Sequence, residues 1–282
     1  MLLSLLAAAA AASLSPAEIV AQAPEAAWRD IAPQDLLVMT LADGGTVTIQ
    51  LAPGWAPVHI ANIAAFADAR FWDGAGINRV QDNYVVQWGD ATRAAPAAVQ
   101  PKPPAEYQRP LAGTGFRALG FPDAYARQTG HAGGWPVATD GKGNGWLVHC
   151  YGMVGVGRDM SPDTGTGAEL YAVIGHAPRH LDRNVALVGR VVDGIERLSA
   201  LPRGDGALGV YADAARHVPI ARIRRGDPDA GAPAWQYLST DSPAFATYAR
   251  ARANRHDAFF NLPAGGADVC NVPVPLRRKP AG

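Results

Sequence analysis

"FWDGAGINRVQDNYVVQWGD", residues 71–90, is the stretch on which the interpretation of the fold depends. Its Asp-Gly dipeptide is a turn signal, and "NYVVQWG" near its end is typical of a buried strand. Arg79, which stays charged at every accessible pH, lies between these two features. Judged in isolation, such an arginine is a structural ion-pair residue, here with Asp82 or Glu169 as partner. The stretch therefore predicts a turn and a strand, and it leaves the role of Arg79 open.

The segments around this stretch predict further strands and two helices. Residues 36–41 and 46–51 are two short apolar runs joined by a turn with two glycines, which predicts a β-hairpin. From Pro57 to Phe71 the apolar residues recur at helical spacing, which predicts a helix lying on the sheet. After residue 152 the sequence again indicates strands, then a helix in "DGIERLSAL" and a last strand in "VPIARIRRG". Many short strands with two helices favour an antiparallel barrel, which has no open edges.

Two segments do not fit the barrel pattern. Residues 91–151 are rich in Ala and Pro and then in Gly, so we expect a long irregular insertion without extended regular elements. Residues 227–282 begin as a linker, and Asp241-Ser242-Pro243 then offers a cap and a first-turn proline for one C-terminal helix. The last residues are Pro-rich and basic, which predicts an extended or disordered end.

Three stretches together resemble the cyclophilin family of peptidyl-prolyl isomerases. "FWDGAGINRVQDNYVVQWGD" is similar to the family's run of an aromatic residue, Asp-Gly, an Arg-Val pair, an aromatic residue and Gln-x-Gly-Asp. "TGAELYAVIG" and "HLDRNVALVGRVVDGIE" are similar to its Gly-Ser-Gln-Phe-Phe strand and to its strand with Leu-Asp, Phe-Gly and Val. The resemblance covers residues 34–226 apart from 91–151. It implies an all-β fold, a closed eight-stranded antiparallel cyclophilin-like barrel with two capping helices.

The resemblance also implies a shallow groove on the outer face of the barrel that binds an X-Pro dipeptide. Arg79 falls on the family's catalytic arginine, and Gln87 falls on the glutamine that orients that arginine and the substrate. The other positions implied in substrate binding are Tyr84, Val85, Gly157, Glu169, Tyr171, Leu181 and His180. The aromatic and leucine side chains among them are also compatible with ordinary barrel core, because alternate strand positions point inward.

Rotation of an X-Pro bond explains why these residue types are needed. The rotation costs ~18 to 20 kcal/mol because amide resonance is lost, although no covalent bond breaks. An arginine can hydrogen-bond the twisted amide, and an apolar pocket can hold the proline ring still. The chain departs from the family pattern at Ile77-Asn78 and Tyr84-Val85, at Glu169, and at His180, where many members have Trp. These departures predict a more polar pocket with altered specificity, in which Glu169 can form an ion pair with Arg79.

Composition and motifs argue against several other functions. The 25 basic and 25 acidic residues cancel and are scattered, so a nucleic-acid partner is not expected. The histidines lack the spacing of metal ligands, so neither a metal nor another cofactor is expected. The stretch "GDGALG" lacks the lysine of a phosphate loop, and no Gly-x-Ser-x-Gly motif is present.

The N-terminus and the cysteines bear on the compartment. Residues 1–23 begin with an uncharged apolar run, Leu2 to Leu14, of a length that predicts a signal peptide and a periplasmic or secreted protein. A disordered Ala-rich tail is the alternative, since no basic residue precedes the run. Cys150 and Cys270 can form one disulfide in an oxidising compartment or remain two separate buried thiols.

Two functions of different classes remain. The first is an exported peptidyl-prolyl cis-trans isomerase that acts on unfolded or partly folded polypeptides with X-Pro bonds, and it is not inserted in the membrane after its signal is removed. The second is a non-catalytic cyclophilin-like binding module or chaperone for Pro-containing segments. A weaker third possibility is a structural domain whose groove is filled by its own residues 91–151.

Overall fold

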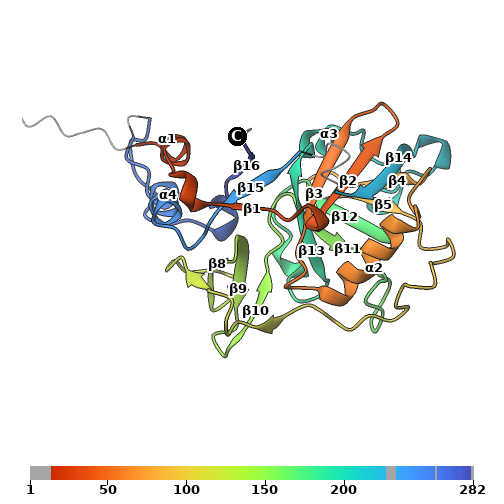
Figure 1. Cartoon of the computed structure of the whole chain (residues 1–282), viewed down its shortest axis with the longest axis horizontal. Coiled ribbons are helices and arrows are strands. Elements are labelled where there is room, and N and C mark those ends of the chain that lie inside the picture. The colour runs from red at the N-terminus through yellow and green to blue at the C-terminus, as the bar shows by residue number, and fades with distance from the viewer. Residues whose placement is uncertain (1–13, 227–232, 258, 281–282) are drawn as a thin grey trace, which may run out of the picture.

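Eight antiparallel strands close into a barrel in the order β11-β12-β5-β4-β14-β2-β3-β13 (Figure 1). The computed structural model describes residues 14–226, 233–257 and 259–280. The barrel strands are β2 (Leu36–Leu41), β3 (Thr46–Leu51), β4 (Gly76–Val80), β5 (Val85–Gly89), β11 (Met153–Val156), β12 (Glu169–Val173), β13 (Leu187–Asp193) and β14 (Val218–Arg225). This confirms the expected fold class.

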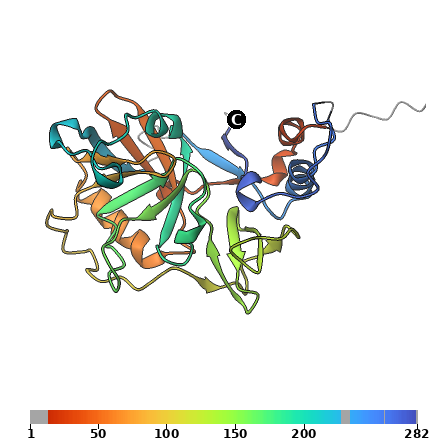
Figure 2. The same cartoon turned by 180° about the vertical axis from the view of Figure 1, so that it is seen from behind.

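The barrel interior is closed by large apolar side chains and by two helices. Met39, Ile77 and Trp88 are fully buried from three different strands. Helix α2 (Pro57–Asp68) adds Ile63 and Phe66 to the same cluster, and the short helix α3 (Ile195–Ser199) adds Leu198. Figures 1 and 2 show the two helices toward opposite ends of the barrel. Both expected capping helices are therefore present, and they leave the outer face of β4, β5 and β12 for other contacts.

The insertion, residues 91–151, was expected to be irregular, but it contains regular strands. It forms a five-stranded antiparallel sheet in the order β6-β10-β9-β8-β7. Its strands are β6 (Arg109–Pro110), β7 (Arg117–Ala118), β8 (Gln128–Ala132), β9 (Trp135–Thr139) and β10 (Asn144–Leu147). Gly133 and Gly134 have φ of +55° and +85°, so they make the tight turn between β8 and β9. The glycines that suggested irregular structure are the residues that allow these hairpins.

This insertion sheet packs on the outside of the barrel. Val137 and Trp146 of the sheet share one buried cluster with Met153 and Leu187 of the barrel. Arg190 of β13 reaches from the barrel wall into the sheet, where its Nη1 donates to the carbonyl oxygen of Gly134 at 2.8 Å. The insertion is therefore a docked layer of the molecule.

A third unit combines both ends of the described chain. Its sheet has the order β1-β15-β16, and two helices cover it. The elements are α1 (Pro16–Ala21), β1 (Trp28–Asp30), β15 (Trp235–Leu238), α4 (Pro243–Ala253) and β16 (Leu276–Arg278). Helix α4 begins at Pro243 with Ser242 as its cap, as predicted, and ends at Ala253. The C-terminal extension thus has two strands beyond the single expected helix, and it is completed by N-terminal residues.

Residues 1–23, predicted to be a signal peptide or a disordered tail, are described only in part. Residues 1–13 lie outside the described residues, so the predicted apolar run is untested there. Residues 16–21 form α1, which Ser15 and Glu18 cap reciprocally and which buries Ile19 in the same cluster as Phe245 of α4. A segment so packed is part of the folded protein.

The two cysteines form a disulfide, which decides the alternative left open by the sequence. Cys150 follows the insertion sheet, and Cys270 lies in the C-terminal extension 120 residues later. Their Cα atoms are 5.1 Å apart. Figures 1 and 2 show the insertion sheet lying next to the third unit, which the disulfide joins to it. Among the described helices, none has the length and apolar character that crossing a membrane requires.

Candidate active site

Arg79 lies on β4 with its guanidinium held from three sides. Its Nε donates to the carbonyl oxygen of Leu208 at 2.7 Å, and its Nη1 donates to Oε1 of Gln87 at 3.2 Å. Its Nη2 donates to Oε1 of Gln81. A guanidinium has one hydrogen on Nε and two on each terminal nitrogen. The described residues accept one hydrogen from each nitrogen, so one on Nη1 and one on Nη2 remain for a ligand. The alternative ion pair with Asp82 is not formed, because Asp82 instead pairs with Arg203 at 2.9 Å.

Glu169 acts on Arg79 through Gln87. Nε2 of Gln87 donates to Oε2 of Glu169 at 3.2 Å, and Nδ2 of Asn78 donates to Oε1 of Glu169 at 3.1 Å. A carboxylate only accepts hydrogen bonds, so it attracts the NH2 group of Gln87 and leaves the Gln87 oxygen for Arg79. Direct pairing of Glu169 with Arg79, which the sequence allowed, is replaced by this indirect contact.

A hollow of about 340 Å³ opens beside the guanidinium on the outer face of the barrel. It brings together seven residues singled out from the sequence, which are Arg79, Tyr84, Val85, Gln87, Gly157, Tyr171 and Leu181. Five further residues line it, which are Val156, Arg158, Asp159, Met160 and Val185. Residues 91–151 are all described, and none of them lines the hollow, so the insertion does not fill it.

The hollow forms because its strands are neighbours in the barrel. Register pairs Arg79 of β4 with Gln87 of β5, and it pairs Gln87 with Tyr171 of β12. Gly157 follows β11, and a Cβ there would lie 3.0 Å from the Cβ of Glu169 and 3.4 Å from Nε2 of Gln87. Glycine at this position therefore leaves room for the side chains that hold Arg79.

Two predicted site residues lie at the edge of the hollow. His180 is exposed, and its ring stacks parallel to that of Tyr84 with centroids 6.1 Å apart. Glu169 lies behind Gln87, whose Nε2 donates to its carboxylate. The guanidinium of Arg79 lies 5.7 Å from the centre of the Tyr84 ring, a cation–π contact. Tyr84 thus connects His180 at the edge with Arg79 in the hollow.

Burial shifts the pKa of two side chains that line the hollow. Partial burial lowers the pKa of Arg79, yet a guanidinium remains protonated at neutral pH. Partial burial also raises the pKa of Tyr84, which keeps its hydroxyl neutral. The hollow therefore presents the permanent cation of Arg79 beside the neutral ring of Tyr84, and Arg158 and Asp159 add a second cation and an anion to its lining.

Sequence reasoning missed the loop that holds Arg79 from outside the barrel. Leu208, in the "GDGALG" stretch, has φ of +56°, and its carbonyl accepts from Arg79. Gly209 packs just after the end of β4, so closely that a Cβ there would lie 2.6 Å from the Cα of Gln81. The glycines of this stretch were the available signal, although they indicate close backbone approach without naming the partner.

His149, beneath the wall of the hollow, was also missed. Its Nε2 lies 2.9 Å from the hydroxyl of Tyr171, and its Nδ1 lies 2.9 Å from Oδ1 of Asp182. Asp182 in turn accepts from Nε of Arg179 at 2.7 Å. The three residues that this chain of contacts adds to Tyr171 are all buried, namely His149, Asp182 and Arg179. No sequence spacing pointed to them, because 22 residues separate His149 from Tyr171.

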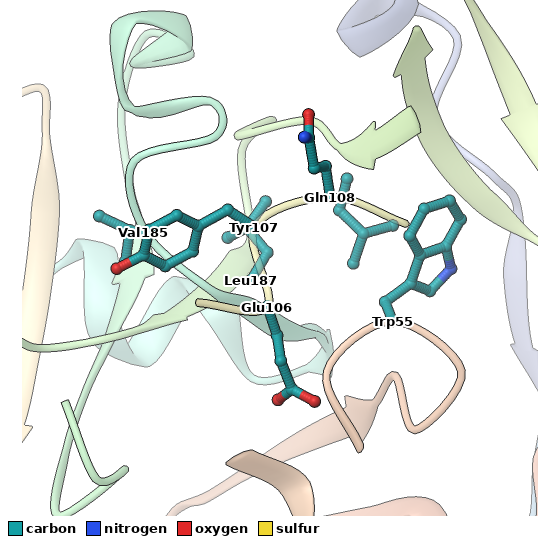
Figure 3. Close-up of a pocket in the computed structure, with 7 residues that line it drawn as sticks. Trp55, Glu106, Tyr107, Gln108, Val185 and Leu187 are labelled. Atoms are coloured by element: carbon teal, nitrogen blue, oxygen red, sulfur yellow. The ribbon is translucent and has the colours of Figure 1, made fainter. Parts of the chain in front are cut away.

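A second, much smaller hollow adjoins the first, and Val185 lines both (Figure 3). Figure 3 shows Tyr107 pointing toward Val185, with Trp55 on the far side. The volume of this second hollow is about 10 Å³, roughly enough for one water molecule. It is too small to admit a peptide.

Comparison with known proteins bears on the family and the fold of the chain. Residues 36–225 match the family described as cyclophilin type peptidyl-prolyl cis-trans isomerase/CLD. Among solved structures, the chain is similar to the cyclophilin AquaCyp293 from Hirschia baltica, with a TM-score of 0.69 and 21% identity over 89% of this chain and 92% of that one. A cyclophilin type isomerase from Cryptosporidium parvum, crystallised with the dipeptide Ala-Pro, gives a TM-score of 0.43 and 13% identity over 68% and 99% of the two chains. No curated protein matches the chain in sequence.

Proposed function

The chain belongs to the cyclophilin-type peptidyl-prolyl cis-trans isomerases, and from this premise we propose that it rotates X-Pro bonds of exported proteins in the hollow beside Arg79. The observation that carries the proposal is the juxtaposition of a held guanidinium with the apolar walls of Tyr84, Val85, Tyr171 and Leu181. The substrates are unfolded or partly folded polypeptides that contain proline.

The proposed chemistry follows from the two halves of the hollow. The proline ring occupies the apolar half, which keeps the ring still while the preceding carbonyl turns. The free hydrogens of Arg79 bond the prolyl nitrogen as it becomes pyramidal, or the carbonyl oxygen as it twists. These bonds are stronger in the twisted state than in the planar one, so they lower the barrier. An acceleration of about 10⁵ requires roughly 7 kcal/mol of such differential binding.

The test is a comparison of wild type, Arg79→Ala and Arg79→Lys on a proline-containing tetrapeptide. Isomerisation is followed by NMR exchange, and affinity by titration of the same peptide. We expect Arg79→Ala to lose at least about 100-fold in kcat/KM with little change in affinity, and Arg79→Lys to recover only part of the loss, because lysine lacks the planar fork. Wild type that binds the peptide without accelerating exchange would favour the non-catalytic binding module instead.

Export is the second part of the proposal. Two features support it, namely the apolar run at residues 2–14 and the Cys150–Cys270 disulfide, which is typical of oxidising compartments. Because Ile19 is packed against α4, cleavage should occur before Ser15, so that α1 and its cap remain. Expression in a Gram-negative host, fractionation and N-terminal sequencing test this. Intact, full-length protein in the cytoplasm would contradict export.

A further inference from the structure

The hydroxyl of Tyr171 is held beneath the hollow by a buried histidine. Tyr171 lines the hollow and is 6% exposed, while His149 is completely buried. The hydroxyl lies 2.9 Å from Nε2 of His149. Since its bonding partner is buried, the hydroxyl is directed into the protein, and the ring is the part of Tyr171 that forms the wall.

The donor and acceptor in this contact follow from Asp182. Both the backbone N–H and Nδ1 of His149 lie within hydrogen-bond distance of Oδ1 of Asp182, at 3.1 and 2.9 Å. Although burial alone would raise it, the pKa of Asp182 is lowered, because His149 and Arg179 donate to the carboxylate. A charged carboxylate only accepts, so Nδ1 carries the proton of the neutral ring and Nε2 must accept from Tyr171.

The protonation states of the other two groups agree with this assignment. Burial lowers the pKa of His149 despite the neighbouring carboxylate, which keeps the imidazole neutral. Burial also raises the pKa of Tyr171 well above its ordinary value, so the phenol keeps its proton. The hydroxyl of Tyr171 is thus a donor and His149 an acceptor.

The facing strand leaves space for this orientation of the ring. Gly155 of β11 is paired with Tyr171 of β12. A Cβ on Gly155 would lie 2.3 Å from the hydroxyl oxygen and 2.4 Å from Cζ of Tyr171. Any side chain at 155 would therefore displace the ring from its present place.

We propose that His149, oriented by Asp182, is a positioning residue that fixes Tyr171 as an apolar wall of the proline-binding hollow. The inference rests on the proposed function, because it deepens the role of the same site. The fixed hydroxyl is removed from the hollow, so the proline ring meets aromatic carbon. Without the acceptor, the hydroxyl must find another partner, and the ring leaves the position that the hollow requires.

The experiment uses two substitutions of His149, which separate its Nδ1 contact with Asp182 from its Nε2 contact with Tyr171. His149→Gln places an acceptor near the position of Nε2, whereas His149→Asn keeps a group near Nδ1 for Asp182 and loses the acceptor for Tyr171. Each is measured in the wild-type background and with Tyr171→Phe. We expect His149→Asn to raise KM for a proline tetrapeptide by about threefold to tenfold with kcat little changed, as loss of one hydrogen bond allows. His149→Gln should stay within about twofold of wild type, and His149→Asn should lose its effect when Tyr171 is Phe.

Two readouts separate this inference from the proposed function. An equal rise in KM for His149→Asn in both backgrounds, or no rise in either, overturns the inference. The imidazole ¹⁵N shifts of the wild-type protein supply a test that needs neither activity nor a variant that folds. We expect a protonated Nδ1 and a bare Nε2 at neutral pH, and a protonated Nε2 overturns the inference. If wild type does not accelerate isomerisation, the proposed function fails, whereas peptide affinity and the tautomer still test the role of His149.

Discussion

At the scale of single residues, Glu169 determines the orientation of the Gln87 amide, with its NH2 group toward Glu169 and its oxygen toward Arg79. Both carboxylate oxygens accept, one from Gln87 at 3.2 Å and one from Asn78 at 3.1 Å. A glutamine at 169 would place its own NH2 group against one of these donors. The site therefore depends on a charge at a position where the family pattern has a neutral amide.

We predict that Glu169→Gln lowers kcat/KM about fivefold, although it restores the residue type of the family pattern. The physical reason is one broken hydrogen bond, worth about 1 kcal/mol, in the chain that presents the Gln87 oxygen to Arg79. The proline exchange assay measures it, with Glu196→Gln, an exposed residue of α3, as the matched control. Unchanged or higher kcat/KM would show that Gln87 is positioned without the charge.

At the scale of elements, the insertion supplies the cap of a barrel helix. Helix α2 begins after Ala56, which has no side chain that could accept from the first backbone N–H groups. Glu106 of the insertion accepts from the backbone N–H of Val58 and of His59, each at 3.0 Å, and pairs with Nδ1 of His59 at 2.7 Å. In Figure 3 the Glu106 carboxylate points away from Tyr107.

We predict that Glu106→Ala lowers the free energy of unfolding by about 2 kcal/mol, because the helix loses its cap and Nδ1 of the buried His59 loses its partner. Glu106→Gln keeps one acceptor and should lose about half as much. Urea unfolding of both variants and wild type measures this. Equal losses for Ala and Gln would mean that the carboxylate does not act as the cap.

Acid should loosen the contact between the insertion sheet and the C-terminal extension. His131 of β8 is 1% exposed, and its Nε2 lies 3.0 Å from the carbonyl oxygen of Val272. Burial lowers the pKa of His131 to about 4 from its ordinary 6.5. The unfolded chain therefore binds a proton that the folded protein does not between these two pH values, so stability falls as pH drops from 6.5 to 4.

We predict that His131 lowers the free energy of unfolding by about 3 kcal/mol at pH 4, relative to neutral pH. Urea unfolding of wild type and His131→Gln at pH 7, 5.5 and 4.5 measures it, with exposed His176→Gln as the control. We expect the His131→Gln curve to fall less steeply with acid than the other two. Parallel curves for all three proteins would refute a neutral, buried His131.

At the scale of the whole molecule, the sequence predicted the barrel better than the layers around it. The hairpin at 36–41 and 46–51 matches β2 and β3, because alternating apolar residues and a glycine turn are local signals. Arg79, Val85, Gln87 and Tyr171 meet because the strands that carry them, β4, β5 and β12, are neighbours in the barrel. Recognition of one family pattern thus supplied what local spacing could not.

The remaining contacts could not be predicted, for identifiable physical reasons. Strand β9 is buried along its whole length, so it lacks the alternation that marks a half-exposed strand. The carbonyl of Leu208 and the ring of His149 act through contacts between distant segments, which residue type alone does not reveal. The pairing of Cys150 with Cys270 likewise depended on a spatial proximity across 120 residues.

That disulfide joins the insertion sheet to the C-terminal extension, so its removal should lower the stability of the folded protein. By the chain-entropy account, closing a loop of 120 residues stabilises the folded state by about 4 to 5 kcal/mol. We expect Cys150→Ala/Cys270→Ala to lose about this much in urea unfolding, and reduced wild type to reach the same value. Isomerase kcat/KM in native conditions should change less than about twofold, because the residues lining the hollow come from the barrel unit.

A loss of unfolding free energy below about 1 kcal/mol would mean that the buried clusters around Phe245 and Trp146 hold the layers without the covalent bond. A large loss of activity would instead place the outer layers in control of the hollow, with His149, the residue next to Cys150, as the connection.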